Sequence, residues 1–546
     1  MALLLEVKNL SVSFVTPWGE VQALQDVNFS LKSGETLAVV GESGCGKTVL
    51  CKSILKLLPP YAQIKTGSVF VNGTDITEYQ ERKMCRLRGK VFSMVLQNPM
   101  TALNPTMTIG AQIAEAVKVH QPKIKGAQLR QQVVDLMQMA GIDRPMERMK
   151  QYPYQFSGGM CQRSVLAVAL AGNPDILFAD EPTTALDAVT QAQILKLFAD
   201  IQQKRGMAAV FVTHDLRAAA AVADRVAVMK QGSILEIGAV KEILCKPRHP
   251  YTCGLLQAYA SFSGEKNGAK PEQKKVEKEI LLDIRHLSCR FLFKNNLENR
   301  IRKKAVVKAV DDLSFQIYQG EIFGLVGESG CGKSTTANCI MNIFKPDNGS
   351  IFFKGMDTCD PKEYRKNRQL LQKTRQLIFQ NSASSLDPRM KVCDIIAEPM
   401  KIQHIIPKRG SMRAEAEYQM RVVGLGAEYL DRYPSELSGG QRQRVAIARA
   451  LTTEPELIVA DEPLASLDVR IQAQLADLFR ELKKEQKVTI LLIAHDLSLV
   501  ESLCDRIGVM CHGRLVECAP TKELFANPKH PYTKLLLDAD RAFGSL

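Results

Sequence analysis

Short apolar runs alternate along the chain with longer stretches whose hydrophobic residues recur at helical spacing. Residues 36–40, 175–179 and 208–213 are largely apolar runs, and a helical pattern over residues 48–58 follows the first of them. Short continuous apolar runs are typical of strands that are buried on both faces, as in a parallel sheet. The pattern predicts an α/β fold with a mainly parallel sheet that holds ligands at the carboxyl ends of its strands.

The chain also repeats itself. Four motifs recur 281 positions later: Ser-Gly-Gly at Ser157 and Ser438, Asp-Glu-Pro at Asp180 and Asp461, His-Asp at His214 and His495, and His-Pro-Tyr-Thr at His249 and His530. A constant spacing over such distances indicates duplicated domains. Residues 262–279 are rich in Lys, Glu, Gly and Ser, as linkers are. We therefore predict one domain over residues 1–261, a charged flexible linker over 262–279 and a second domain over 280–546.

Composition and charge exclude several classes of protein. At 546 residues, with 45% hydrophobic and 24% charged residues, the chain is an ordinary globular protein with several cores. Its apolar runs are far shorter than the roughly 20 residues of a membrane span, and we expect no signal peptide. The 14 cysteines form no Cys-x-x-Cys pair, which favours free cytosolic thiols over disulfides, zinc or iron–sulfur ligation. The net charge of +14 is spread along the sequence, and we interpret it as solvated surface rather than a nucleic-acid-binding face.

Two segments match the phosphate-loop pattern, each directly after a predicted strand and at the start of a predicted helix. Glycines let the backbone amides of such a loop converge on phosphate oxygens, and the helix N-terminus adds partial positive charge. The residues predicted to contact nucleotide are Gly41, Ser43, Gly44, Cys45, Gly46, Lys47, Thr48 and Val49 in the first loop, and Gly327, Ser329, Gly330, Cys331, Gly332, Lys333, Ser334 and Thr335 in the second. We expect Lys47 and Lys333 to reach the β- and γ-phosphates, and the hydroxyls of Thr48 and Ser334 to ligate Mg²⁺.

A pair of acidic residues ends one apolar run in each half. Asp180 and Glu181 follow residues 176–179, and Asp461 and Glu462 follow residues 457–460. An aspartate at the carboxyl end of a strand can face Mg²⁺, and its neighbour can polarise an attacking water as a general base. The sequence thus predicts ATP hydrolysis, with Asp180 and Asp461 as metal ligands and Glu181 and Glu462 as catalytic bases.

Taken in order, these motifs resemble those of the ATP-binding-cassette (ABC) ATPase family, and the resemblance covers both halves almost end to end. It implies two tandem domains, each with a mainly parallel RecA-like core, an antiparallel β subdomain and an α-helical signature subdomain. It further implies that the two halves face head to tail, so that Lys47 works with Ser438 and Lys333 with Ser157 on ATP.

The resemblance assigns roles to further residues that carry little signal alone. The signatures Ser157-Gly158-Gly159 and Ser438-Gly439-Gly440 would bring backbone N–H groups to the γ-phosphate, as a Ser at a helix start with small neighbours can. Gln97 and Gln380 match the glutamine loop that senses Mg²⁺ and nucleotide and abuts the transmembrane partner. His214 and His495 match the switch histidine, and Asp187 and Asp468 match the loop that crosses between halves.

Adenine usually needs an aromatic platform. Phe14 and Phe291 each end a Leu-Ser-x-x-Phe segment and are the candidates that we predict. The alternation of Leu10, Val12 and Phe14 also fits an apolar strand face, so a core role for Phe14 stays open, and Trp18 competes with it in the first half.

The two halves differ at positions near the expected sites. Val49 lies where Thr335 follows the second phosphate loop, and Met160-Cys161 replaces Gln441-Arg442. None of the expected catalytic groups is lost. We therefore expect two competent ATP sites with some asymmetry.

The ends of the two halves narrow the family further. His-Pro-Tyr-Thr at His249 and His530, and the segments after Gln97 and Gln380, resemble those of ATPases from dipeptide, oligopeptide and nickel importers. The resemblance implies two transmembrane permease partners, an extracytoplasmic substrate-binding protein that acts through them, and a place on the cytoplasmic face of the membrane. The cargo, whether dipeptide, oligopeptide, glutathione-like thiol or nickel chelate, would touch only those partners.

Two other classes carry the same cassette, namely ribosome-associated tandem translation factors and DNA-repair ATPases. The first carry a long charged helical insertion between cassettes, whereas residues 262–279 are short and contain glycines and a proline. The second interrupt the cassette with coiled coils or zinc modules, which the sequence does not show. The translation factor stays the alternative.

Overall fold

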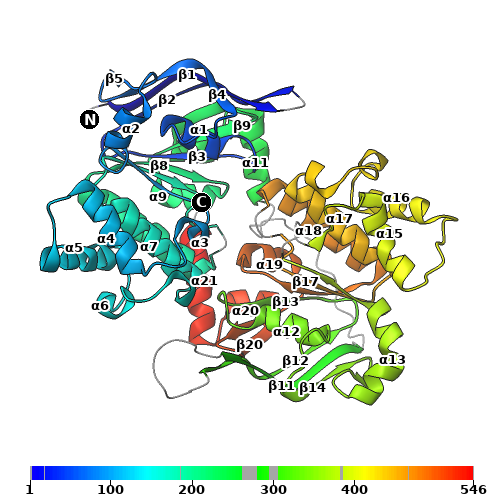
Figure 1. Ribbon diagram of the computed structural model, residues 1–546. Helices are drawn as coiled ribbons and strands as arrows, with labels where there is room; N and C mark the ends of the chain where they lie inside the picture. Colours follow the sequence, from blue (N-terminus) through cyan, green and yellow to red (C-terminus); the bar gives the residue numbers. More distant parts are fainter. Residues whose placement is uncertain are drawn as a thin grey trace. The chain divides into compact units, whose positions relative to one another are not determined.

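The computed structural model describes residues 3–16, 19–184, 186–260, 279–293, 305–380, 385–464 and 467–544. Trp18 and nearly all of the predicted linker lie outside these residues. The chain divides into two compact units: Met1–Tyr259 together with Arg541–Leu546 form the first unit, and Ala260–Asp540 form the second unit (Figure 1). Across the described residues, no helix is both long and apolar enough to cross a membrane.

The first unit is built on a six-stranded sheet. Its order is β10 (Ser233–Ala239), β9 (Arg225–Lys230), β3 (Thr36–Val40), β8 (Ala208–Thr213), β7 (Ile176–Asp180) and β6 (Phe92–Val95), and only the pair β9 and β10 is antiparallel. Every residue of β3, β7 and β8 is buried, because both faces of the sheet are covered. The predicted mainly parallel α/β fold is confirmed.

A second, antiparallel sheet has the order β2 (Gly19–Lys32), β1 (Leu3–Thr16), β4 (Ala62–Val71) and β5 (Thr74–Asp75). Helix α1 (Lys47–Ile54) lies between the two sheets, and its Leu50 and Cys51 are fully buried in a core with residues of both (Figure 1). Because α1 packs against a sheet on each side, this core determines the position of the loop that precedes the helix.

The predicted helix over residues 48–58 is wrong in its last four residues. Helix α1 ends at Ile54, and Lys56 has φ 51°, in the left-handed region. The N–H of Leu57 donates to the carbonyl oxygen of Lys52 at 2.8 Å. This backbone cap closes the last turn before two prolines that could not continue the helix.

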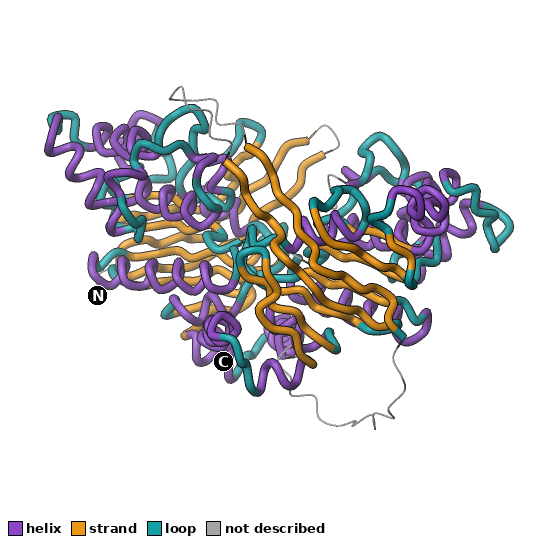
Figure 2. Tube along the Cα trace, turned by 90° about the horizontal axis from the view of Figure 1, so that it is seen from below, coloured by secondary structure: helices purple, strands orange, loops and turns teal. Residues whose placement is uncertain are grey.

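The remaining helices of the first unit cover the sheets and form a helical region. They are α2 (Glu81–Leu87), α3 (Pro99–Ala102), α4 (Ile109–His120), α5 (Gly126–Met139), α6 (Pro145–Arg148), η1 (Pro153–Gln155), α7 (Gly158–Leu170), α8 (Ala188–Arg205), α9 (Leu216–Val222), α10 (Val240–Cys245) and α11 (Pro250–Ala260). Helices α4, α5 and α7 share one core with β7 and β8, whereas α9, α10 and α11 share another with β3 and β9. Figure 2 shows the strands of each unit running side by side with helices along them.

The second unit repeats this architecture. Its sheets have the orders β16-β17-β18-β13-β19-β20 and β12-β11-β14-β15. The strands are β11 (Ile280–Phe293), β12 (Ala305–Tyr318), β13 (Ile322–Val326), β14 (Asn348–Phe353), β15 (Met356–Asp357), β16 (Arg375–Ile378), β17 (Leu457–Asp461), β18 (Thr489–Ile493), β19 (Arg506–Cys511) and β20 (Arg514–Pro520). The helices are α12 (Lys333–Ile340), α13 (Pro361–Thr374), α15 (Val392–Ile402), α16 (Met412–Val422), η2 (Ala427–Tyr429), η3 (Pro434–Glu436), α17 (Gly439–Leu451), α18 (Val469–Gln486), α19 (Leu497–Leu503), α20 (Thr521–Ala526) and α21 (Pro531–Gly544).

Candidate functional site

The first phosphate loop joins β3 to α1 and needs glycine for two reasons. A Cβ at Gly41 would lie 2.1 Å from the carbonyl oxygen of Met229, so no side chain fits there. Gly44 and Gly46 have φ of 82° and 105°, a conformation that side-chain-bearing residues rarely adopt. The loop therefore curls tightly and opens directly into the N-terminus of α1, the geometry that cradles phosphate.

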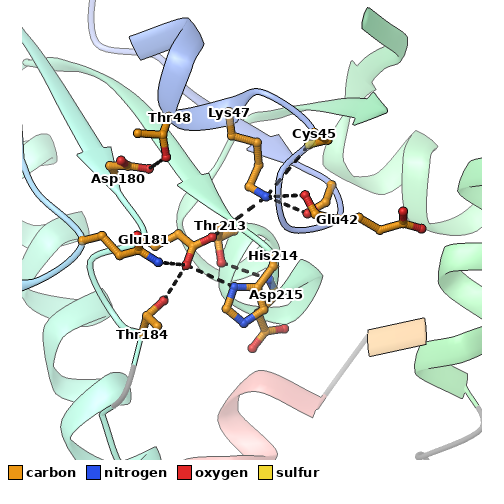
Figure 3. A network of polar contacts seen from close by, with 12 residues as sticks. Glu42, Cys45, Lys47, Thr48, Asp180, Glu181, Thr184, Thr213, His214 and Asp215 are labelled. Atoms are coloured by element: carbon orange, nitrogen blue, oxygen red, sulfur yellow. Dashed lines mark hydrogen bonds and ion pairs between the residues drawn. The ribbon is translucent and has the colours of Figure 1, made fainter. Parts of the chain in front are cut away.

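Lys47 is buried, with 5% of its surface exposed, and its ammonium group is held inside the loop. It donates to the carbonyl oxygens of Gly41 at 2.8 Å and Glu42 at 2.9 Å. It also lies 3.9 Å from Oε1 of Glu181. Figure 3 shows the amine between the loop and this carboxylate. A buried cation needs such partners, and these oxygens hold the ammonium group of Lys47 within the phosphate loop.

Thr48 and Asp180 meet across the two elements that carry them. The Thr48 hydroxyl, in the first turn of α1, donates to Oδ1 of Asp180, at the end of β7, at 3.0 Å. Burial raises the pKa of Asp180, while the bond from Thr48 opposes the change. Hydroxyl and carboxylate oxygens are the hard ligands that Mg²⁺ prefers, so this pair fits the metal.

Glu181 occupies the centre of the cluster with its backbone in the left-handed region, at φ 46°. Its Oε2 accepts from Nε2 of Gln97 at 2.8 Å and from the hydroxyl of Thr184 at 2.9 Å, and lies 3.4 Å from Nδ1 of His214. Burial alone would raise the pKa of Glu181, but His214, Lys47 and Thr184 together lower it to about 2. Glu181 is thus a carboxylate at neutral pH, held by donors from three separate loops.

His214 follows β8, and its protonated ring forms an ion pair with Glu181. Burial disfavours the imidazolium form, but the contact with Glu181 outweighs it and raises the pKa of His214. The carbonyl oxygen of His214 accepts from the Tyr259 hydroxyl at 2.7 Å. Both the ring and the backbone of His214 are therefore held.

The second unit assembles the same cluster from the equivalent residues. Lys333 donates to the carbonyl oxygens of Gly327 at 2.7 Å and Glu328 at 2.8 Å, and Ser334 donates to Asp461 at 3.0 Å. Glu462 accepts from Gln380 at 2.6 Å and lies 3.7 Å from Nδ1 of His495. His495 is the largest of the influences that lower the pKa of Glu462 against the opposing effect of burial. One difference is written in the sequence: Ala465 replaces Thr184 and cannot donate to the glutamate.

The signature residues lie at the start of helices α7 and α17, apart from the clusters around the lysines. Ser157, Gly158, Ser438 and Gly439 are exposed, whereas Gly159 and Gly440 are buried. Ser157 Oγ accepts from the N–H of Met160 at 3.4 Å, as an N-cap does. Ser438 makes the same bond to Gln441 at 3.3 Å, and Gln441 Oε1 accepts in return from Ser438 N–H at 2.9 Å. Met160 replaces Gln441 in the first unit and has no side-chain oxygen to accept from the N–H of Ser157. The cap of α17 therefore has one more hydrogen bond than the cap of α7.

Two aspartates that the resemblance singled out cap helices as well. Asp187 accepts from the N–H of Thr190 at 2.9 Å at the start of α8, and Asp468 accepts from the N–H of Ile471 at 3.0 Å at the start of α18. These contacts explain their local fold, and the role of either aspartate between the two units stays a prediction.

The aromatic candidates for adenine lie on the antiparallel sheets. Phe14 is half-buried on β1, with its ring 5.9 Å from that of Tyr61, and Phe291 on β11 lies 5.5 Å from Phe344. Leu10 and Val12 are fully buried, but the expected alternation does not continue to Phe14, because the register shifts between Val12 and Ser13 and Ser13 is buried as well. Whether Phe14 stacks on adenine or only packs stays a prediction.

Sequence reasoning missed three kinds of contact with the cluster. The Thr184 hydroxyl touches Glu181, Tyr259 touches His214, and the Tyr532 hydroxyl accepts from the N–H of Glu328 in the second phosphate loop at 3.0 Å. Only the tyrosine of His-Pro-Tyr-Thr had a signal, because the motif recurs. Its position against the phosphate loop depends on the fold.

Two phosphate loops, each with a lysine, an Asp-Glu strand end and a histidine after the next strand, define a tandem phosphate-loop ATPase. The ABC transporter family model matches residues 24–184 and 310–465, and the oligopeptide/dipeptide transporter C-terminal region matches residues 235–294 and 516–542. The chain belongs to the ABC transporter family, whose cassettes bind and hydrolyse ATP. The predicted family, with two fused cassettes of the peptide branch, is confirmed.

Curated relatives extend over nearly the whole chain. The chain is 39% identical to the glutathione import ATP-binding protein GsiA of Shigella dysenteriae, over 98% of this chain and 89% of that protein. It is 41% identical to the peptidoglycan transport ATP-binding protein YejF of Agrobacterium fabrum, over 98% and 96%. These relatives favour an importer subunit over the translation-factor alternative.

Among solved structures, the chain is similar to cbiO1 from Clostridium perfringens, part of an ABC transporter complex, with 26% identity over 46% of this chain and 92% of that one. The TM-score is 0.38. The family assignment therefore depends on the sequence matches.

Proposed function

We propose that both units bind Mg-ATP and hydrolyse its terminal phosphoanhydride bond, and that the chain powers a membrane importer of peptide-like solutes. One observation carries the proposal. In each unit the glutamate that follows the strand-end aspartate contacts a glutamine and a histidine from two other loops. This glutamate also lies near the buried lysine of a phosphate loop. If the two acidic residues merely ended a strand at the surface, the glutamate would not have the same two partners in both units.

Each group has a role that its surroundings support. Lys47 and Lys333 bind the β- and γ-phosphates, while Thr48 with Asp180, and Ser334 with Asp461, hold Mg²⁺ with help from Gln97 and Gln380. Bound Mg²⁺ neutralises charge on the phosphate oxygens. Glu181 and Glu462 accept a proton from the attacking water, and His214 and His495 hold those carboxylates and contact the γ-phosphate.

We further propose that each ATP is completed by the signature of the other unit, so that Lys47 acts with Ser438 and Lys333 with Ser157. The free backbone N–H groups at the start of α7 and α17 suit a phosphate oxygen. A structure with ATP in which each nucleotide touched only one unit would contradict this pairing.

The expected permease partners have a matching surface on each unit. Leu96 and Met100 flank Gln97 with 38% and 49% of their surfaces exposed, and Phe379, beside Gln380, is 46% exposed. Large apolar side chains on a surface next to a nucleotide-sensing residue suit a docking site for another protein. We place the chain on the cytoplasmic face of the membrane, on two permease subunits that receive solute from a substrate-binding protein.

The solute class follows from the relatives. One is named for glutathione import and one for peptidoglycan transport, and both ligands contain peptide bonds. The His-Pro-Tyr-Thr regions match the oligopeptide and dipeptide branch in both units. We therefore propose short peptides or peptide conjugates as cargo, which touch the permeases and not this chain.

Reconstitution with the neighbouring permeases in liposomes tests the proposal. ATP hydrolysis is measured with and without binding protein loaded with a set of short peptides, and the Glu181→Gln/Glu462→Gln chain is the control. We expect loaded binding protein to stimulate hydrolysis and to drive peptide uptake in the wild type only. An ATPase that copurifies with ribosomes, and whose loss leaves peptide uptake unchanged, would overturn the importer assignment.

A further inference from the structure

A helix begins within each His-Pro-Tyr-Thr motif, α11 in the first unit and α21 in the second, and contacts residues of the predicted ATP site. In the second unit the Tyr532 hydroxyl, in the first turn of α21, accepts from the backbone N–H of Glu328 at 3.0 Å. The carbonyl oxygen of the same Glu328 accepts from Nζ of Lys333 at 2.8 Å. One residue of the phosphate loop thus links the tyrosine to the lysine that holds phosphate.

The first unit places Tyr251 in the same position. Tyr251 is 4% exposed and its ring lies under the ammonium of Lys230, at 4.6 Å. Burial raises the pKa of its hydroxyl, and the charge of Glu42 raises it further. It stays a neutral hydroxyl at physiological pH.

The start of the helix is fixed by a carboxylate from the preceding hairpin. Glu236, on β10, accepts from the N–H groups of Arg248 at 2.8 Å and His249 at 3.1 Å, and His249 Nδ1 accepts from the N–H of Tyr251 at 3.1 Å. The second unit repeats each bond, with Glu517, Lys529, His530 and Tyr532. The glutamate and the motif histidine of each unit therefore position the backbone at the tyrosine.

The far end of the helix reaches the switch histidine. The Tyr259 hydroxyl, in the last turn of α11, donates to the carbonyl oxygen of His214 at 2.7 Å and accepts from the N–H of Leu216 at 2.9 Å. In the second unit Asp540 takes this position and accepts from the Ser498 hydroxyl at 3.3 Å. Helix α21 thus contacts both the phosphate loop and the segment that follows His495, and α11 contacts His214 and the segment that follows it.

Helix α11 packs into the core of the first unit. Tyr251 and Leu255 of α11 pack in a core with β3, β9 and α9, and Leu255 is 2% exposed. The eight residue steps from Tyr251 to Tyr259 span about 12 Å of helix. We propose that Tyr532 is a positioning residue for the phosphate-loop lysine Lys333, and that Tyr259 is a positioning residue for His214. The inference rests on the proposed roles of Lys333 and of His214.

The two contacts predict different kinetic effects. Without the Tyr532 hydroxyl, the Glu328 peptide and Lys333 lose their brace, so binding of both ATP and ADP weakens. Without the Tyr259 hydroxyl, His214 shifts against Glu181, so turnover falls while nucleotide binding persists. A change from Tyr to Phe keeps the ring and its packing in both cases.

Nucleotide affinity tests the first contact. Binding of fluorescent ATP and ADP analogues is measured on the full chain carrying Lys47→Ala, so that the second phosphate loop dominates the signal. We expect Tyr532→Phe to raise the Kd for both nucleotides about 3- to 10-fold, as the loss of one hydrogen bond would. Tyr364→Phe, which alters another tyrosine of the same unit, is the control and should leave the Kd unchanged. An equal Kd in Tyr532→Phe and the control overturns the assignment.

Steady-state ATPase measurements test the second contact. In a chain whose second site is inactivated by Glu462→Gln, Tyr259→Phe should lower kcat about 3- to 10-fold with KM within about 2-fold of that parent chain, while Tyr79→Phe should change neither. A purely structural role would lower the Tm with both constants unchanged, and that result would refute the inference. If the wild-type chain itself fails to bind or hydrolyse ATP, the proposed function fails; if only the tyrosine variants behave as wild type, the inference alone fails.

Discussion

The two glycines of each signature should respond in opposite ways to substitution by alanine. A Cβ at Gly158 would have only Leu186 Cδ2 near it, at 3.8 Å, an ordinary contact. A Cβ at Gly159 would lie 2.4 Å from Cγ2 of Thr190, which is inside the contact distance of any two carbons. Packing within the unit therefore explains the second glycine and does not explain the first.

The magnitudes follow from these distances. Alanine in a helix is favoured over glycine by about 0.5–1 kcal/mol, so Gly158→Ala should stabilise α7 by up to that amount and raise the Tm by about 1–4 °C. Gly159→Ala gains the same term but adds an overlap that costs about 1–3 kcal/mol. Thr190 cannot rotate away easily, because its N–H and hydroxyl are both bonded to Asp187.

Function should follow the opposite order. If the N–H groups at Gly158 and Gly439 approach a γ-phosphate, a methyl group there blocks the approach, and Gly158→Ala/Gly439→Ala should lose ATPase activity by about 10-fold or more despite its higher Tm. In Gly159→Ala, adding Thr190→Ser removes the clashing methyl and keeps the hydroxyl, so it should restore the Tm.

The assays are differential scanning fluorimetry and phosphate release at saturating ATP, on the full chain. A Gly158→Ala/Gly439→Ala chain that keeps near-normal ATPase activity would refute the reasoning about the first glycine. Failure of Thr190→Ser to restore the Tm of Gly159→Ala would refute the packing argument for the second.

Three further predictions concern the glutamate cluster. Glu181→Gln with Glu462→Gln should lower phosphate release by about 10²- to 10⁴-fold while equilibrium ATP binding persists, and near-normal turnover would show that another group activates the water. Thr184→Ala should raise the pKa of Glu181 but leave it ionised at pH 7, so phosphate release should fall no more than about 10-fold; Ala465, which lacks the hydroxyl in the second unit, indicates that the position tolerates the change. The contact between Glu181 and His214 should stabilise the first unit in a defined pH window. The lowered pKa of Glu181 gives a contribution that is complete above its ordinary value of 4.5 and is lost as pH falls toward 2; the raised pKa of His214 gives one that is complete below 6.5 and is lost as pH rises through the raised value. His214→Gln should therefore lower the Tm more at pH 5.5 than at pH 9, and an equal loss at both would contradict the ion pair.

The sequence alone determined the class of protein and identified most of the residues that the structure brings together in each cluster. The phosphate loops, the Asp-Glu strand ends and the histidines are local patterns whose residue types are dictated by phosphate and metal chemistry, so they could be found without a structure. The repeat at a constant offset showed two domains, and apolar runs such as residues 36–40 showed buried strands. These signals are readable because each depends on neighbours in the chain.

The tertiary structure decided how those residues act on one another. Gln97 and Glu181 are 84 positions apart, and they meet because β6 and β7 are neighbouring parallel strands whose carboxyl ends share one edge. Tyr259 and His214 are 45 positions apart, and they meet because α11 packs back onto the sheet. No local pattern encodes such contacts, because their free energy comes from burying apolar faces far apart in sequence, and only the folded sheet brings the polar groups within hydrogen-bonding distance.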